Sequence, residues 1–321
     1  MADANNPYGI TWPENKSFAF TVFDDTDFAS PANVREVYAL LIDLGVLVTK
    51  SVWPLKGPEE SSWWGVTCDD QAYLDWVCET QAQGVEIAFH NASYESSERP
   101  RVADGIDKFE SLFGSPPRAY TCHAQCRENV YWGADRVSGS NRLAYNMLGG
   151  FRSRARYEGH VDDSPWFWGD ICRSKISYVR NFVFRGINTL AACPIMPYHD
   201  PDRPYVNHWF ASSEGKDCDA FVGCLSESNQ DLLEEQGGAC IMYTHFGWGF
   251  HQDGVLNVRF RQLMERLSRK NGWFVPVSTL LDYLLEAKGA HTITPAERNG
   301  LERKWLADRT RIRLMEALRR R

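Results

Sequence analysis

The acidic run at residues 23–27, Phe-Asp-Asp-Thr-Asp, directly follows an apolar stretch and has the residue types needed for metal or acid–base chemistry. Two adjacent carboxylates at the end of a strand can diverge, one towards a cation and one towards a water molecule. A divalent ion accepts carboxylate and imidazole ligands, and a second carboxylate beside it can act as a general base. Alternatively, one aspartate caps the following helix while the others are solvated turn residues.

Two histidines, His90 and His245, also end apolar stretches, which read Glu-Ile-Ala-Phe-His and Ile-Met-Tyr-Thr-His. The second histidine is followed by Phe-Gly-Trp-Gly-Phe, in which Gly247 and Gly249 allow the backbone to bend close to a ligand. The intervening Trp248 could form a wall for an acyl group or a sugar. A lone histidine is more often a core or loop residue, but three such strand ends together favour a shared site.

Apolar strands alternate with amphipathic helices along the chain, and this alternation predicts parallel strands with crossover helices, hence an α/β fold. The predicted strands are residues 18–23, 46–52, 85–89, 119–122, 146–151, 177–184, 239–243 and 273–275. The predicted helices are residues 32–44, 70–83, 101–113, 256–270 and 278–287. In a barrel of parallel strands the strand ends share one face, which would bring the two aspartates, His90, His123 and His245 together.

Three segments resemble, in order, the motifs of the polysaccharide deacetylase (NodB-like) family, also called carbohydrate esterase family four. They are Thr21–Asp25, Gly84–His90 and Ile241–His245. The tail at residues 272–284 is similar to the last strand and helix of that family. The resemblance covers roughly residues 17–130 and 238–287.

The resemblance implies a deformed (β/α) barrel with about seven parallel strands and, in this chain, long inserted loops. It further implies that Asp24 is the general base, that Asp25 and His90 bind a divalent metal, in the first instance Zn²⁺, and that His245 is the general acid. The implied metal would polarise an amide carbonyl and activate a water molecule.

The sequence departs from the family pattern at Tyr94, because the family has a second histidine at this position, four residues after the first. We take His123 as the candidate for the missing metal ligand. It lies between Cys122 and Cys126, so a structural zinc site at this segment is an alternative. Arg127, in the same segment, could supply a positive charge near the site.

Four side chains are candidates for contacts with the substrate: Arg127, Trp248, Tyr94 and His199. His199 belongs to a segment at residues 194–205 that is dense in rings, prolines and polar groups. This segment could line a sugar pocket or form a rigid proline loop. Aromatic residues make up 13% of the chain, a high share that also suits a sugar-binding cleft.

We expect one barrel domain over residues 1–292, in which residues 152–238 form a loop-rich insertion or lid. Residues 293–321 are predicted to form a basic helix. This helix could pack against the domain or a second copy of the chain, or bind an acidic surface.

The formal net charge of −7 disfavours a general nucleic-acid-binding protein, which needs positive charge to displace counterions from phosphates. The first residues do not resemble a signal peptide, and no apolar run is long enough to span a bilayer. The nine cysteines are scattered and odd in number, which disfavours a disulfide framework. We therefore expect a cytoplasmic protein.

The predicted function is metal-dependent hydrolysis that removes an N-acyl group, in the first instance N-acetyl, from an amino sugar or sugar precursor, in a context such as surface polysaccharide synthesis. One alternative is an amidase for a small non-sugar amide. Another is a non-catalytic carbohydrate-binding protein on the same fold, which the missing histidine at Tyr94 would explain.

Overall fold

Seven parallel strands close into a barrel in this computed structural model, which describes residues 8–58, 61, 64–148 and 156–319. Around the ring, β1 pairs with β2, then come β3, β4, β5, β7 and β8, and β8 pairs with β1 again. The prediction of a deformed (β/α) barrel with about seven parallel strands is confirmed. The barrel strands are β1 (Phe18–Asp24), β2 (Thr49–Val52), β3 (Glu86–Phe89), β4 (Ala119–Tyr120), β5 (Tyr178–Phe184), β7 (His208–Glu214) and β8 (Ala239–Thr244).

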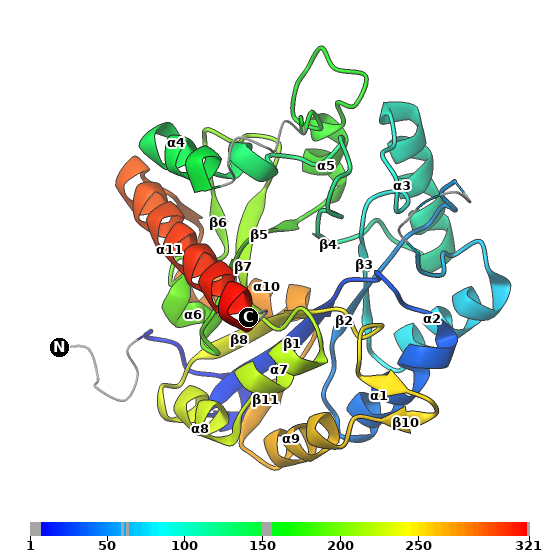
Figure 1. Cartoon of the computed structure of the whole chain (residues 1–321), viewed down its shortest axis with the longest axis vertical. Helices are drawn as coiled ribbons and strands as arrows, with labels where there is room; N and C mark the ends of the chain where they lie inside the picture. The colour runs from blue at the N-terminus through cyan, green and yellow to red at the C-terminus, as the bar shows by residue number, and fades with distance from the viewer. Residues whose placement is uncertain (1–7, 59–60, 62–63, 149–155, 320–321) are drawn as a thin grey trace.

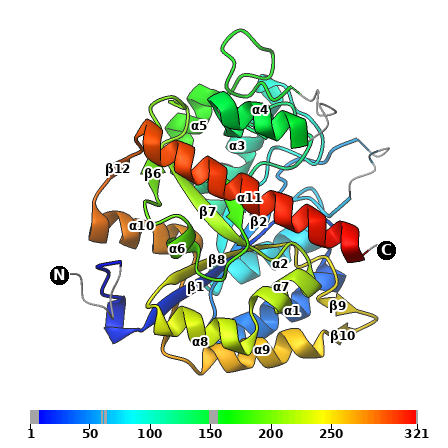
Figure 2. The same cartoon turned by 60° about the vertical axis from the view of Figure 1, so that its left-hand side comes forward.

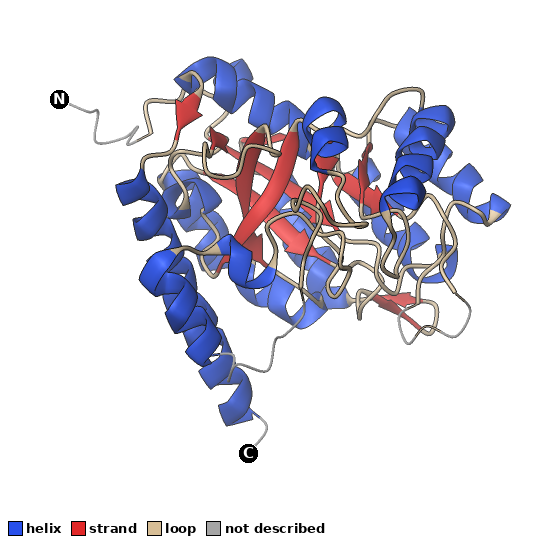
Figure 3. Ribbon diagram, turned by 90° about the horizontal axis from the view of Figure 1, so that it is seen from above, coloured by secondary structure: helices blue, strands red, loops and turns tan. Residues whose placement is uncertain are grey.

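Helices surround the barrel and cover its outer surface, as Figures 1 and 3 show. They connect successive strands, as parallel pairing requires. The helices are α1 (Pro31–Asp43), α2 (Gln71–Ala82), α3 (Arg99–Phe113), α4 (Gly139–Leu148), α5 (Gly169–Lys175), α6 (Thr189–Ala192), α7 (Cys218–Cys224), α8 (Glu227–Glu235), α9 (Val258–Ser268), α10 (Val277–Lys288) and α11 (Pro295–Arg319), with short 3₁₀ turns η1 (Pro13–Asn15) and η2 (Gly133–Arg136).

Five short strands extend or accompany the barrel. β11 pairs with the first half of β1, β6 lies antiparallel to β7, and β12 pairs with β6. β9 and β10 form a separate two-stranded ribbon. Their bounds are β6 (Tyr198–His199), β9 (His251–Gln252), β10 (Val255–Leu256), β11 (Gly272–Phe274) and β12 (His291–Thr292).

Side chains of β1 alternate between the barrel interior and the helix layer. Phe23 stacks on Phe210 of β7 inside the barrel, with 6.1 Å between the ring centroids. The next residue, Asp24, instead reaches Tyr38 on α1. Because successive side chains of a strand face opposite sides, Asp25 belongs with Phe23 on the barrel side.

The sequence around α1 explains where this helix begins and ends. Ser30 and Asn33 form a capping box, and Pro31 occupies the first turn, where a missing N–H does no harm. The apolar stripe at Val34, Val37, Tyr38 and Leu41 is buried against the barrel. Gly45, in the left-handed region at φ 68°, follows the helix.

Residues 152–238 do not form the loop-rich insertion or lid that we expected, because β5 and β7 of the barrel lie within them. β7 was not predicted because about half of its residues, in the sequence His-Trp-Phe-Ala-Ser-Ser-Glu, are polar. Ser213 of this strand is nevertheless buried and its hydroxyl is hydrogen-bonded to that of Thr189.

The predicted strand at residues 146–151 is also wrong: residues 146–148 end α4, and residues 149–151 lie outside the described residues.

The predicted C-terminal helix is present as α11, and it is docked on the barrel near β5 and α4 (Figure 2). Its fully buried Glu302 accepts hydrogen bonds from Ser138 and Asn141 and pairs with Arg203. Trp305 is buried against Phe182 of β5. Polar and apolar contacts thus fix the helix along its first half.

Within the described part of the chain, no helix combines the length and the apolar character needed to cross a lipid bilayer.

Candidate active site

The carboxylate of Asp27, three residues beyond the end of β1, lies among three histidines. Its Oδ2 is 2.9 Å from His90 Nε2, its Oδ1 is 2.8 Å from His123 Nε2, and its Oδ2 is 3.7 Å from His245 Nε2. His90 follows β3, His123 follows β4 and His245 follows β8. The strand ends therefore converge on one face of the barrel, as expected from the sequence.

Hydrogen bonds at the far side of two rings set which nitrogen carries the proton. His90 Nδ1 lies 3.0 Å from the carbonyl oxygen of Thr121, and His245 Nδ1 lies 2.6 Å from that of Lys216. A carbonyl oxygen only accepts, so Nδ1 is the donor in both rings. In the neutral ring, Nε2 then presents a lone pair towards Asp27. Since a carboxylate is also an acceptor, a proton or a cation must join the two.

Burial would by itself raise the pKa of Asp27, but hydrogen bonds and positive charge from His123 and His90 outweigh it and hold the pKa well below its usual range. Asp27 is 4% exposed. The site thus favours an ionised carboxylate in a buried position.

Asn91 locks together the two loops that carry His90 and His123. Its backbone is left-handed, at φ 64°, a conformation that asparagine tolerates better than most residues. Its Oδ1 accepts from the backbone N–H of His123 at 2.9 Å, and its Nδ2 donates to Glu128 at 2.8 Å. Burial raises the pKa of Glu128 to about 7.

Trp53 forms a buried wall behind the histidines. Its ring centroid lies 5.8 Å from that of His90 and 5.4 Å from that of His123. The indole is fully buried, so it keeps water from the back of both imidazoles and restricts their rotation.

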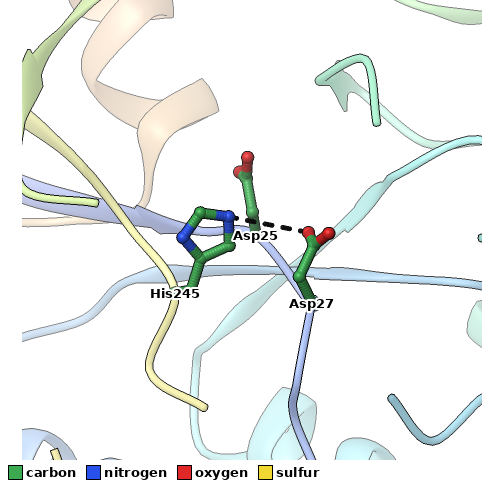
Figure 4. Close-up of side chains that lie close together, drawn as sticks. All are labelled: Asp25, Asp27 and His245. Carbon is green, nitrogen blue, oxygen red and sulfur yellow. Dashed lines mark ion pairs between the residues drawn. The ribbon is translucent and has the colours of Figure 1, made fainter. Parts of the chain in front are cut away.

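Asp25 lies beside Asp27 and is held by Arg180 of β5. The guanidinium donates to both carboxylate oxygens, at 2.8 and 2.5 Å, and both side chains are buried. Burial would lower the pKa of Arg180, but the charge of Asp25 raises it above its usual value. Potential ligand atoms of Asp25, Asp27 and His245 all lie within 4.8 Å of one another (Figure 4).

Asp24 lies on the opposite side of β1 and is fully buried. Its Oδ2 accepts from Tyr38 at 2.7 Å and is 3.0 Å from Lys50 Nζ, while Oδ1 accepts from the backbone N–H of Phe246 at 2.7 Å. Burial would lower the pKa of Lys50, yet Asp24 raises it. This placement does not suit the role of general base that we expected for Asp24, since the residue ties β1 to β2, α1 and β8.

A cavity of about 480 Å³ opens above the carboxylates and histidines. Asp25, Asp27, His90 and His245 line it together with Arg180. Aromatic side chains form much of its remaining wall: Phe28, Trp132, Tyr243, Trp248 and Trp305. The cavity therefore has polar groups at one end and flat apolar surfaces around them, a combination that is common in small-molecule sites.

Of the four predicted substrate contacts, Trp248 lines the cavity. The other three lie outside its lining. Arg127 is exposed and pairs with Glu158. Tyr94 donates to the carbonyl oxygen of Pro58, and His199 bonds through Nδ1 to that of Asn207.

Roles for Asp27, Arg180 and Asn91 were not predicted from the sequence. Asp27 comes two residues after Asp25, so an extended backbone would place both side chains on the same side of the strand. This spacing could have indicated that Asp27 belongs to the site. Arg180 is a lone cation within an apolar predicted strand, which is a recognisable sign of a buried partner. Nothing in the sequence around Asn91 indicated its left-handed backbone.

The donor types of the site, carboxylate oxygen and imidazole nitrogen, are those that a divalent metal ion accepts, and the group whose ligand atoms lie within 4.8 Å of one another is Asp25, Asp27 and His245. Asp27 supplies carboxylate oxygens, while His90 and His123 supply Nε2 atoms that face that carboxylate. Such nitrogen and oxygen donors, with the opposite ring nitrogen of His90 on a carbonyl, are typical of zinc sites. Asp25 suits a ligand role less, because both of its oxygens are bound by Arg180.

The barrel has the fold of the polysaccharide deacetylases. A protein of Mycobacterium smegmatis assigned as a polysaccharide deacetylase is similar in structure with a TM-score of 0.51 and 13% identity, over 89% of this chain and 96% of that chain. One of Pseudomonas aeruginosa PAO1 has the same TM-score and coverage at 12% identity. The Puue allantoinase also has a TM-score of 0.51 and the same coverage, at 13% identity.

No family model matches the sequence, and no curated protein matches it either. At such low identity the structural likeness shows a shared fold. Because the names of these neighbours include both deacetylases and an allantoinase, the substrate must be inferred from the site itself.

Proposed function

We propose that this chain is a metal-dependent hydrolase that removes an N-acyl group, most simply an N-acetyl group, from an amino sugar or a sugar precursor. The proposal rests on one observation above all. The Asp27 carboxylate meets three imidazole Nε2 atoms at the base of a cavity of about 480 Å³. The fold shared with polysaccharide deacetylases adds support.

In this proposal Asp27, His90 and His123 hold a divalent ion, with Zn²⁺ suited to their nitrogen and oxygen donors. When bound, such an ion polarises the amide carbonyl and lowers the pKa of a water molecule. The family resemblance implied that Asp25 is the aspartate that binds the metal. In this proposal Asp27 takes that role instead.

Asp25 takes the role of general base in place of Asp24. Arg180 holds its carboxylate at the cavity wall in one orientation, next to Asp27 and His245. A carboxylate positioned in this way can accept a proton from the attacking water molecule. Asp24 has no comparable access, since its contacts lie on the helix side of β1.

His245 keeps the role of general acid. Its Nδ1–H is held by the carbonyl oxygen of Lys216, so Nε2 is the atom that can carry a proton into the cavity. The side chain is 12% exposed and therefore more accessible than His90 or His123, at 1% each. Nε2–H would donate to the leaving amine nitrogen as the carbon–nitrogen bond breaks.

The test separates metal binding from turnover. Asp27→Asn, His90→Ala and His123→Ala are expected to lose bound metal, measured per mole of purified protein. Asp25→Asn is expected to keep the metal and to lose turnover on N-acetylated sugars by about 10²-fold or more, measured as released amine. His251→Ala, a histidine on β9 outside the cavity lining, is the matched control and should change neither quantity.

Full metal occupancy in the Asp27→Asn variant would contradict the assignment of ligands. Sugar binding without any amine release, in metal-loaded wild-type protein, would instead favour a non-catalytic carbohydrate-binding protein on this fold.

A further inference from the structure

Arg136, the last residue of η2, is a buried cation in the wall of the active-site cavity. It is 8% exposed. Among the described residues, the guanidinium has no hydrogen-bond acceptor and no carboxylate partner. Its Nε is buried without a hydrogen bond. The contacts of the guanidinium are aromatic: it lies 3.2 Å from the ring centroid of Trp132 and 5.6 Å from that of Trp305.

Other buried arginines of the molecule have a carboxylate partner. Arg180 pairs with Asp25, Arg203 with Asp200 and Glu302, and Arg298 with Asp200. Arg136 departs from this pattern in the part of the chain that the structure describes.

A buried guanidinium without an anion is costly, because it has lost its hydration and gained no opposite charge. Burial accordingly lowers the pKa of Arg136 to about 9. An anion carried by a ligand would supply the missing opposite charge. The cavity in front of Arg136 is the same one that Asp27 and His245 line.

We propose that Arg136 binds an oxyanion, a carboxylate or a phosphate, carried by the substrate in this cavity. If the proposed function holds, the substrate is an N-acylated amino sugar that carries an acidic group. This identification of the substrate rests on the proposed function. The anion site itself depends only on the surroundings of Arg136.

The aromatic neighbours suit this role. Stacking on Trp132 leaves the edge of the planar guanidinium, which bears the N–H groups, available for a bidentate contact with two anion oxygens. Trp305 comes from α11, so the C-terminal helix completes the wall. Arg309, also on α11, adds a second positive charge to the cavity lining.

Acidic groups in the cavity do not cancel this positive wall. Asp25 is paired with Arg180, and Asp27 faces the histidines. Glu214 also lines the cavity, where it accepts a hydrogen bond from the backbone N–H of Lys216, and burial raises its pKa. An anionic substrate group is therefore best placed at the Arg136 end.

The binding test uses inorganic phosphate as the probe, titrated at pH 7.5 into full-length, metal-loaded wild-type protein and three variants by calorimetry. Arg136→Gln is expected to weaken phosphate binding at least 10-fold, and Arg136→Lys less. The matched control is Arg142→Gln, an exposed arginine of α4 paired with Asp135, which should leave the dissociation constant within about twofold.

Thermal unfolding distinguishes an anion site from a structural role. Without phosphate, Arg136→Gln should have a Tm at least as high as the wild type, since it removes a buried unpaired charge. Phosphate should raise the Tm of the wild type and not that of Arg136→Gln. Unchanged phosphate affinity in Arg136→Gln, or no binding by the wild type, would overturn the proposal.

Substrate pairs then identify the source of the anion and separate this proposal from the proposed function. N-acetylglucosamine is compared with its 1-phosphate and with its 6-carboxylate analogue for amine release. The acidic compounds should have a KM at least 10-fold lower, and this preference should vanish in Arg136→Gln. Phosphate binding that depends on Arg136, with no amine release from any of the three, would retain the anion site and reject the deacetylase proposal.

Discussion

Three aspartates within four residues, Asp24, Asp25 and Asp27, have three different surroundings. Asp24 faces the helix layer and pairs with Lys50, Asp25 faces the barrel mouth and pairs with Arg180, and Asp27 faces histidines. The alternation of a strand explains the first difference. Asp25 and Asp27 differ because their side chains reach different strands: Asp25 reaches β5, and Asp27 reaches the histidines that follow β3, β4 and β8. Identical residue types therefore serve stability in one case and the candidate site in the other two.

We expect Asp24→Asn to destabilise the fold by about 3–5 kcal/mol, because it leaves Lys50 buried without an opposite charge. Urea unfolding measures this loss. The double variant Asp24→Asn, Lys50→Met should recover part of it, since no charge is then left unpaired. An Asp24→Asn protein as stable as the wild type, but inactive, would return Asp24 to the role of base.

At the scale of elements, α11 connects the C-terminal segment to the candidate site. Glu302 anchors the helix to Ser138, Asn141 and Arg203, and one turn further on Trp305 reaches the cavity wall. The helix was predicted from its sequence, but its partners were not. Its position makes it part of the cavity, in addition to the packing role that the sequence suggested.

We expect Glu302→Ala to weaken the docking of α11, because several buried donors lose their acceptor at once. The free energy of unfolding should fall by about 3 kcal/mol, and limited proteolysis should cut faster near residue 294. Arg303→Ala, at an exposed position of the same helix, is the control and should behave as the wild type. Equal proteolysis of the two variants would contradict this role for Glu302.

At the scale of the whole molecule, the site depends on loops that follow strands far apart in the chain. The loops after β3 and β4 are held by a buried network around Asn91 and Glu128. Glu128 also accepts from the backbone N–H of Ser97. Because burial raises the pKa of Glu128 to about 7, the folded state retains a proton that the unfolded chain releases near pH 4.5.

The contribution of Glu128 to stability is therefore greatest below about pH 4.5 and is lost as the pH rises to about 7. Over this interval we expect it to decrease by about 3 kcal/mol. Urea unfolding of Glu128→Gln at pH 5, 6 and 7 should show a smaller decrease with pH than that of the wild type. Glu235→Gln, at an exposed position, is the control and should keep the wild-type slope.

Local patterns in the sequence were sufficient for most of the fold and for part of the site. Apolar periodicity predicted six of the seven barrel strands, and strand-end positions predicted that His90, His123 and His245 would meet an acidic run. β7 was missed because its polar residues bond inside the molecule, where a sequence pattern cannot assign them partners.

Local sequence patterns were enough to predict a parallel barrel with acidic and imidazole groups at one end, since strand period and chain order are local properties. Long-range packing sets which aspartate faces the histidines, pairs Arg180 with Asp25, and leaves Arg136 without a carboxylate partner among the described residues. Asp25 and Arg180, for example, are 155 positions apart in the chain, and barrel closure sets the distance between them.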